Sequence, residues 1–176
     1  MNIRFAQVQD LEACFELDAS FDTDYVWQME SGRTANAMSA AFRVTRLPRS
    51  MRVPVATLRD QVAEHFERGE CFLVAAEDSA ITGYLDLTID PWTRVAWLSH
   101  LTVAGNRRRK GVGTALLRQA IKWVHDREST TLMAGVSTKN YPAGCFLQKH
   151  GFAFCGFNDR YYASRDIALF FAATVK

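Results

Sequence analysis

The sequence predicts a mixed α/β fold, and three of its features support this class. Apolar runs of strand length alternate with helical patterns, for example the run at 71–76 and the pattern at 112–124. A glycine-containing turn links a strand ending near Val103 to the second of these. Of the 176 residues, 48% are hydrophobic and 23% are charged, which is ordinary for a globular domain with a proper core. We therefore expect one domain spanning residues 1–176.

Composition also excludes several kinds of partner. A net charge of +2 is too small to predict nucleic-acid binding. The four cysteines are far apart and form no metal-ligand spacing, so we expect neither a metal site nor disulfides, and a reducing cytoplasm as the setting. There is no apolar run of membrane-spanning length, so no membrane partner is expected. Monomer and homodimer both stay open.

The first half of the chain is expected to contain strands and two helices. One helix is expected to be capped by Asp10 and to reach Leu17; the other runs from a capping box at Thr57 and Asp60 to a stop at Gly69. Strands are expected at 2–5, 25–29, 41–47, 71–76 and 81–89, with a polar loop at 31–36 and breaks at Pro48 and Pro54.

The second half repeats the alternation. A strand from Arg94 leads to the glycine turn and the helix, and a further strand covers 131–136. A short helix then begins near Pro142, which suits a first helical position, and ends at Gly151, which suits a C-terminal cap. Another strand follows, and 167–172 is expected to be the last one.

The turn before the central helix has the chemistry of a phosphate cradle. First-turn N–H groups of a helix lack intrahelical partners, and the peptide dipoles add partial positive charge there. Gly111 and Gly113 remove side chains that would hold a phosphate away, and Arg108, Arg109 and Lys110 add cationic donors. The spacing fits neither a P-loop nor a dinucleotide-binding glycine motif.

Two ordered motifs resemble the GNAT family of N-acetyltransferases. The first is R-x-x-G-x-G at 108–113, preceded by Leu101, Thr102 and Val103. The second is N-x-x-A-x-x-F, formed by Asn140, Ala143 and Phe146 and followed by Gly151. Segments 24–30, 46–49 and 167–171 are similar to the streptothricin-acetyltransferase-like branch.

The resemblance implies a mostly antiparallel central sheet with a splayed parallel pair and helices on both faces. It implies acetyl-CoA as cosubstrate and Val103 as a backbone donor to the thioester oxygen, alongside other expected catalytic residues, Ser99 and Tyr141. The implied cofactor-binding residues are Leu101, Thr102, Val103, Arg108, Arg109, Lys110, Gly111, Val112, Gly113, Thr114, Asn140, Ala143 and Phe146.

The chain departs from the family pattern at two positions. Ser99 stands where an acidic residue is frequent, and Leu147 stands where a tyrosine is frequent that resembles a proton donor to the leaving thiolate. Tyr141 is one replacement that the sequence offers. His100 is expected to face away from Ser99 by strand alternation and to be packed or solvated rather than catalytic.

The acceptor side is expected in residues 22–54 and on the strand at 81–89. Aromatic faces and carboxylates together suit a cation, so Asp24, Trp27, Glu30 and Asp86 are predicted to bind a small-molecule or peptide amine. Asp86 has a plainer interpretation, in which it lies on the wet face of its strand. Two function classes follow: an N-acetyltransferase that modifies a primary amine, and an acyl-CoA-binding regulatory module with weak or no transfer.

Overall fold

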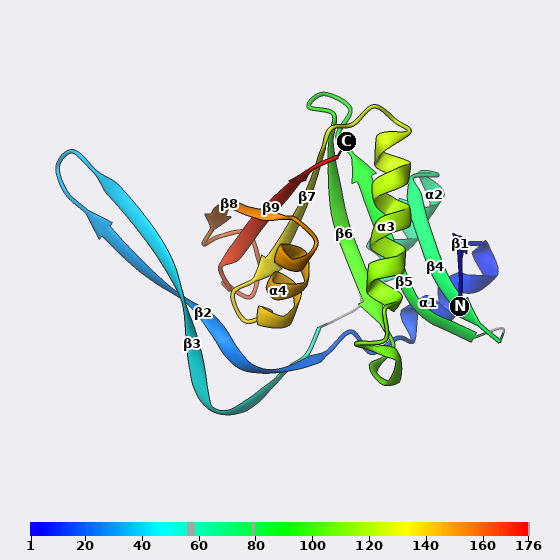
Figure 1. Cartoon of the computed structure of the whole chain (residues 1–176), viewed down its shortest axis with the longest axis horizontal. Coiled ribbons are helices and arrows are strands. Elements are labelled where there is room, and N and C mark those ends of the chain that lie inside the picture. Colours follow the sequence, from blue (N-terminus) through cyan, green and yellow to red (C-terminus); the bar gives the residue numbers. More distant parts are fainter. Residues whose placement is uncertain (56–58, 79, 176) are drawn as a thin grey trace. The chain divides into compact units, whose positions relative to one another are not determined.

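The computed structural model describes residues 1–55, 59–78 and 80–175. It divides the chain into two compact units (Figure 1). The first comprises Met1–Ala19, Val55–Ala134 and Ala172–Lys176, and the second comprises Ser20–Pro54 and Gly135–Phe171. Strands β7 (Thr131–Ser137) and β9 (Ala168–Thr174) contribute residues to both units. The expectation of a single domain stays a prediction.

The first unit is built on a sheet in the order β1-β4-β5-β6-β7. Neighbouring strands from β1 to β6 are antiparallel, and β6 and β7 run parallel. The parallel pairing extends from Val95 opposite Thr131 to Leu98 opposite Ala134, so the end of β6 lies beyond it in the described part of the chain. These strands are β1 (Asn2–Phe5), β4 (Cys71–Glu77), β5 (Ala80–Ile89) and β6 (Val95–Val103).

Helices cover both faces of this sheet. Helix α3 (Val112–His125) packs against one face of β4 and β5, where Gly83 lies against Val112 and Leu116. On the other face, helices α1 (Leu11–Phe15) and α2 (Arg59–Glu67) join Phe72 and Tyr84 in a buried cluster. The strands are consequently apolar on both sides, which explains the near-continuous apolar run at 71–76.

The second unit contains a long two-stranded ribbon, β2 (Phe21–Arg33) and β3 (Met38–Val53). It also contains helix α4 (Tyr141–Lys149), strand β8 (Ala153–Asn158) and the remaining parts of β7 and β9, in the strand order β7-β9-β8 (Figure 1). Trp27 of β2 connects the ribbon to this part, since its backbone N–H donates to the carbonyl of Thr138 at 2.9 Å.

Most expected elements are confirmed, and three details are wrong. Asp10 does occupy the N-cap position of α1, but its side chain does not cap that helix: its carboxylate accepts from Arg4 at 2.6 Å and from the N–H of Gln7 at 2.7 Å, and α1 ends at Phe15 and not at Leu17. The predicted loop at 31–36 begins too early, because 31–33 still belong to β2 and 34–37 form the connection to β3. Pro48 lies inside β3 and does not end it.

Two predicted helix stops are confirmed, and one cap cannot be compared. Gly69 and Gly151 have φ of 67° and 85°, the left-handed conformation that ends a helix. The predicted capping box at Thr57 lies outside the described residues.

Candidate active site

The start of α3 has the form of an anion site. Gly111 takes a left-handed φ of 87°, and among the described residues no side chain caps the helix behind it. A Cβ built on Gly111 would meet no atom within 4 Å, so the space in front of the first turn is open. The N–H groups of this turn can therefore meet a phosphate, and the residues present fit the pyrophosphate of coenzyme A.

Of the cationic residues before this helix, some hold the loop by hydrogen bonds or ion pairs and others are exposed. Arg108 donates from Nε to the carbonyl of Val103 at 2.9 Å and from Nη2 to the carbonyl of Asp18 at 2.7 Å, which ties the loop to the end of β6. Arg107 forms an ion pair with Glu77 at 2.7 Å. Arg109 and Lys110 are exposed. Direct phosphate binding by Arg108, Arg109 and Lys110 stays a prediction.

The end of β6 carries the residues expected to hold the thioester. Opposite β5, the register changes between Asp86 paired with His100 and Leu87 paired with Leu98, so Ser99 is the extra residue of a β-bulge and is exposed. Bulges of this kind re-aim side chains next to active sites. Thr102 is buried, and Val103 is half-buried at the point where the strand meets the loop.

The second motif forms the N-terminus of α4 in the second unit. Asn140 is its N-cap, and the side-chain oxygen accepts from the N–H of Ala143 at 3.2 Å. The ring of Phe146 lies against that of His150 in a tilted arrangement, with ring centroids 4.3 Å apart. Leu147, at the position of the family tyrosine, is 2% exposed and belongs to the core. Contact of Asn140, Ala143 and Phe146 with the cofactor stays a prediction.

Tyr141 lies in an aromatic cluster. Its ring centroid is 5.3 Å from that of Tyr25 and 5.8 Å from that of Trp27. A hydrogen bond with the thiol of Cys145 raises the pKa of the Tyr141 hydroxyl. The Trp27 Nε1 is buried with no hydrogen-bond partner among the described residues, and it lies against Gly144 of α4. Tyr25 and Trp27 of β2 therefore lie next to Tyr141, one of the predicted catalytic residues.

The carboxylates of β2 that are predicted to bind the acceptor, Asp24 and Glu30, do not form a cluster with each other in the described residues. Glu30 pairs with Arg43 across the ribbon at 2.9 Å, and both side chains are more than half exposed. Asp24 is exposed at the irregular step of the β2–β3 register. Their role in binding an amine stays a prediction.

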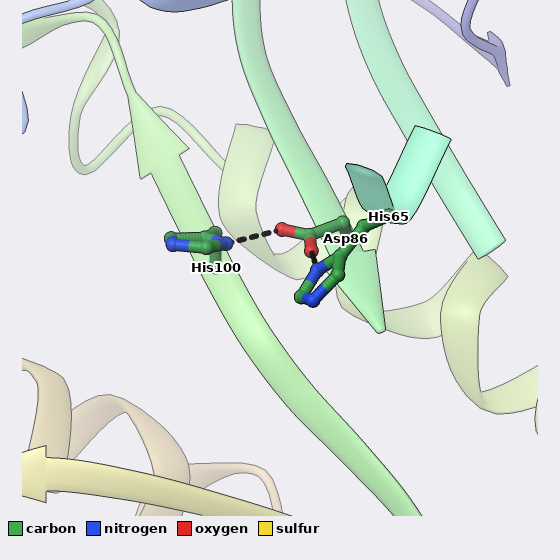
Figure 2. A group of neighbouring side chains, drawn as sticks. All are labelled: His65, Asp86 and His100. Atoms are coloured by element: carbon green, nitrogen blue, oxygen red, sulfur yellow. Dashed lines mark hydrogen bonds and ion pairs between the residues drawn. The ribbon is translucent and has the colours of Figure 1, made fainter. Parts of the chain in front are cut away.

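The surroundings of Asp86 differ from those predicted from the sequence. It is 1% exposed, so its placement on a wet face is wrong. Its Oδ2 meets Nδ1 of His65 at 2.5 Å, and its Oδ1 meets Nδ1 of His100 at 2.8 Å (Figure 2). Burial by itself raises the pKa of Asp86, but the hydrogen bonds from His100 and His65 outweigh it, and the pKa is lowered. The hydrogen bond to Asp86 raises the pKa of His65 against the effect of burial.

A hollow of about 550 Å³ lies elsewhere in the first unit. Its lining includes Trp123 and Arg127, at the C-terminal end of α3, and Glu70. Since α3 spans roughly 20 Å, this hollow is remote from Gly111 and does not belong to the cradle.

Comparison with known proteins decides the family. Residues 34–152 match the model of the acetyltransferase (GNAT) family. The chain belongs to this family. It is therefore an N-acetyltransferase with acetyl-CoA as donor, and the alternative of a regulatory module is not favoured.

Named relatives agree with the narrower branch. The chain is 26% identical to a streptothricin acetyltransferase of Streptomyces lavendulae over 167 residues, covering 90% of this chain and 85% of the relative. Streptothricin acetyltransferase A of Bacillus subtilis (strain 168) is 34% identical over 83 residues, 45% of this chain and 48% of that protein.

A solved structure supports the fold. The crystal structure of nourseothricin acetyltransferase superposes with a TM-score of 0.85 at 24% identity, covering 99% of this chain and 98% of the other. In the part of the chain that the structure describes, no helix is long and apolar enough to cross a membrane.

Proposed function

We propose that this N-acetyltransferase modifies a cationic primary amine of the streptothricin class. The observation that carries the proposal is the similarity to a streptothricin acetyltransferase along 90% of the chain. The branch, unlike the family as a whole, points to a particular class of acceptor.

The residues of the ribbon support a cationic acceptor. Tyr25 and Trp27 form an aromatic group with Tyr141, and aromatic faces attract ammonium groups by about 0.5–2 kcal/mol depending on desolvation. Asp24 adds an exposed carboxylate next to Tyr25. Glu30 contributes less, because Arg43 already neutralises it.

Each part of the machinery has a proposed task. The first turn of α3 and the loop Arg108–Lys110 bind the pyrophosphate, and the backbone N–H of Val103 stabilises the oxygen of the acyl group. Such a donor contributes about 10²–10³-fold to the rate. Tyr141 is the proposed donor of a proton to the departing sulfur. A thiol with a pKa near ~8.5 leaves tolerably even without such a donor.

The test is thiol release from acetyl-CoA with amines of graded charge, including streptothricin, a polyamine, a lysine derivative and an aminoglycoside. Cationic acceptors should be preferred, and Asp24→Asn should raise their KM selectively. Asp22→Asn is the matched control, since Asp22 lies on the same strand but pairs with Arg52 at 3.4 Å. A preference that survives Asp24→Asn unchanged would remove Asp24 from the site, and turnover of acidic or apolar amines only would overturn the acceptor class.

A further inference from the structure

We propose that His100 is the base that takes the proton from the acceptor amine and that Asp86 is its positioning residue. The inference rests on the proposed function and concerns a histidine that strand alternation predicts to be packed or solvated. It starts from three side chains, His65, Asp86 and His100, that belong to α2, β5 and β6 and converge inside the first unit (Figure 2).

The hydrogen bonds fix which nitrogen of His100 is available. Asp86 is buried and anionic at neutral pH, because its pKa lies below the usual range. A carboxylate only accepts, so His100 donates from Nδ1 to Oδ1 over 2.8 Å. The neutral imidazole then carries its lone pair on Nε2, which points away from Asp86 in Figure 2. This is the arrangement by which a carboxylate holds a histidine base in the productive tautomer.

His65 serves a different purpose from His100. Its side chain is 11% exposed, against 22% for His100, and it donates to the second oxygen of Asp86. With both oxygens hydrogen-bonded, the buried carboxylate is fixed in direction and its charge is compensated. His65 therefore stabilises Asp86, and His100 is the imidazole with the more accessible edge.

The position of His100 on β6 also favours it. Val103, the proposed donor to the acyl oxygen, lies on the same strand. About 10 Å of strand separate the two Cα atoms, so the proton reaches Nε2 through bridging water. Next to the bulge at Ser99, His100 pairs with Asp86 across the strands, and its side chain meets the carboxylate that His65 of α2 also contacts.

The proposed step transfers one proton to His100 before the amine attacks the thioester. The ammonium group of the acceptor passes one proton to Nε2 of His100, which becomes an imidazolium paired with Asp86. The free amine attacks the thioester carbonyl; the C–N bond forms, the C–S bond breaks, and the sulfur leaves with the electron pair. Tyr141, in its proposed role, gives its proton to the thiolate and regains one from solvent. The amine nitrogen loses its second proton to water, and His100 returns its own proton to solvent.

Other ionisable groups surround the cluster and set its charge. From α2 and the residues after it come His65, Arg68 and Glu70. Burial raises the pKa of Cys14 on α1 and of Cys71 on β4 to about 12, and it also raises the pKa of Tyr84 on β5. The two thiols and the Tyr84 hydroxyl are neutral around pH 7, so Asp86 and His65, whose pKa the hydrogen bond to Asp86 raises, determine the charge next to His100.

The first experiment is the pH dependence of kcat/KM with acetyl-CoA and an accepted amine. The parent should show a limb that rises with pH as the free enzyme loses one proton from an imidazole. His100→Gln should lose this limb and fall about 10²- to 10⁴-fold, with calorimetric acetyl-CoA affinity unchanged. Imidazole added to His100→Ala should restore part of the rate.

A matched control separates this effect from any histidine change. His125 also lies next to a carboxylate, Asp126 at 3.6 Å, but on the exposed end of α3, and His125→Gln should keep the parental profile. If His100→Gln retains the imidazole limb and the parental rate, the dyad is wrong while the transferase function stands. If the parent itself acetylates no amine, the proposed function fails instead.

The second experiment observes the dyad without turnover. In the enzyme free of ligands, ¹⁵N NMR should show His100 protonated at Nδ1 at neutral pH, and Asp86→Asn should shift it toward the other tautomer and lower kcat more than it raises KM. His100 protonated at Nε2 in the parent would overturn the proposal. So would stoichiometric Zn²⁺ binding that both His65→Gln and His100→Gln abolish together with activity, since the cluster would then be a metal site.

Discussion

Gly111 and Gly151 offer a matched pair of substitutions for testing the phosphate cradle. Their φ angles are 87° and 85°, and at either residue an added Cβ meets no atom within 4 Å. Valine at either position therefore costs about 1–2 kcal/mol of backbone strain without a steric clash inside the protein. Both variants should lower the unfolding temperature by a similar amount, roughly 2–8 °C for a chain of this size.

Only Gly111→Val should affect acetyl-CoA. The new side chain occupies the open space before the first turn of α3 and displaces the phosphate from its N–H donors. Hydrogen bonds to a charged group contribute about 1.5–3 kcal/mol, so Kd should rise roughly 10- to 100-fold. Titration calorimetry with acetyl-CoA measures this, and Gly151→Val should keep the parental Kd. Equal affinities of the two variants would refute the cradle.

Three further predictions follow from individual contacts. Leu147→Tyr forces a larger side chain into a core position, so it should reduce the free energy of unfolding by about 1–3 kcal/mol in a denaturant titration. Turnover should not rise; higher turnover would mean that the tyrosine hydroxyl reaches the sulfur. A lysine at position 108 cannot bridge the carbonyls of Val103 and Asp18, so Arg108→Lys should lower the free energy of unfolding by about 1–3 kcal/mol in the same titration. Arg109→Gln should leave the free energy of unfolding unchanged and weaken only acetyl-CoA binding; equal stability of the two variants would contradict the role of Arg108 in holding the loop. Because the pKa of His65 is raised in the folded protein, its stabilisation of the fold is complete below about pH 6.5 and is lost as the pH rises through the folded-state pKa. The pKa of Asp86 is lowered, so its stabilisation of the fold is complete above about pH 4. The free energy of unfolding should therefore decline above about pH 6.5, and His65→Gln should flatten that decline; an unchanged slope would show that His65 is not coupled to folding.

The elements with local signals could be predicted from the sequence. Gly69, Gly111 and Gly151 mark helix boundaries because left-handed backbone suits glycine, and the structure has all three in that conformation. The resemblance implied a mostly antiparallel sheet with one parallel pair, but the strand order and the identity of that pair as β6 and β7 emerged only from the structure, since strand pairing is not encoded locally. The ordered pair of motifs likewise indicates the family from the sequence alone, and the family match confirms it.

The length of the β2–β3 ribbon could not be predicted, and Pro48 shows why. Proline lacks an N–H and usually breaks a strand ladder. Here the register jumps from Thr23 opposite Met51 to Tyr25 opposite Arg46, so Pro48 falls in an irregular step where no regular ladder bond is needed. Only the paired strands reveal such a step.

The His65–Asp86–His100 cluster was missed for a related reason. Alternation along β5 predicts one wet face, but α1 and α2 cover that face and bury Asp86. Pairing of Asp86 with His100 follows from the β5–β6 register and could have been inferred from a hairpin alignment of the two strands. His65 arrives from a separate helix, which no spacing in the sequence indicates.

Acetylation of streptothricin tests the central claim most directly. The purified chain, incubated with acetyl-CoA and streptothricin, should release one thiol for each acetyl group that mass spectrometry finds on an amine of the product, and His100→Gln should slow this reaction at unchanged acetyl-CoA affinity. Tight binding of acetyl-CoA with neither thiol release nor an acetylated product, for streptothricin and for every amine of the panel, would contradict the account.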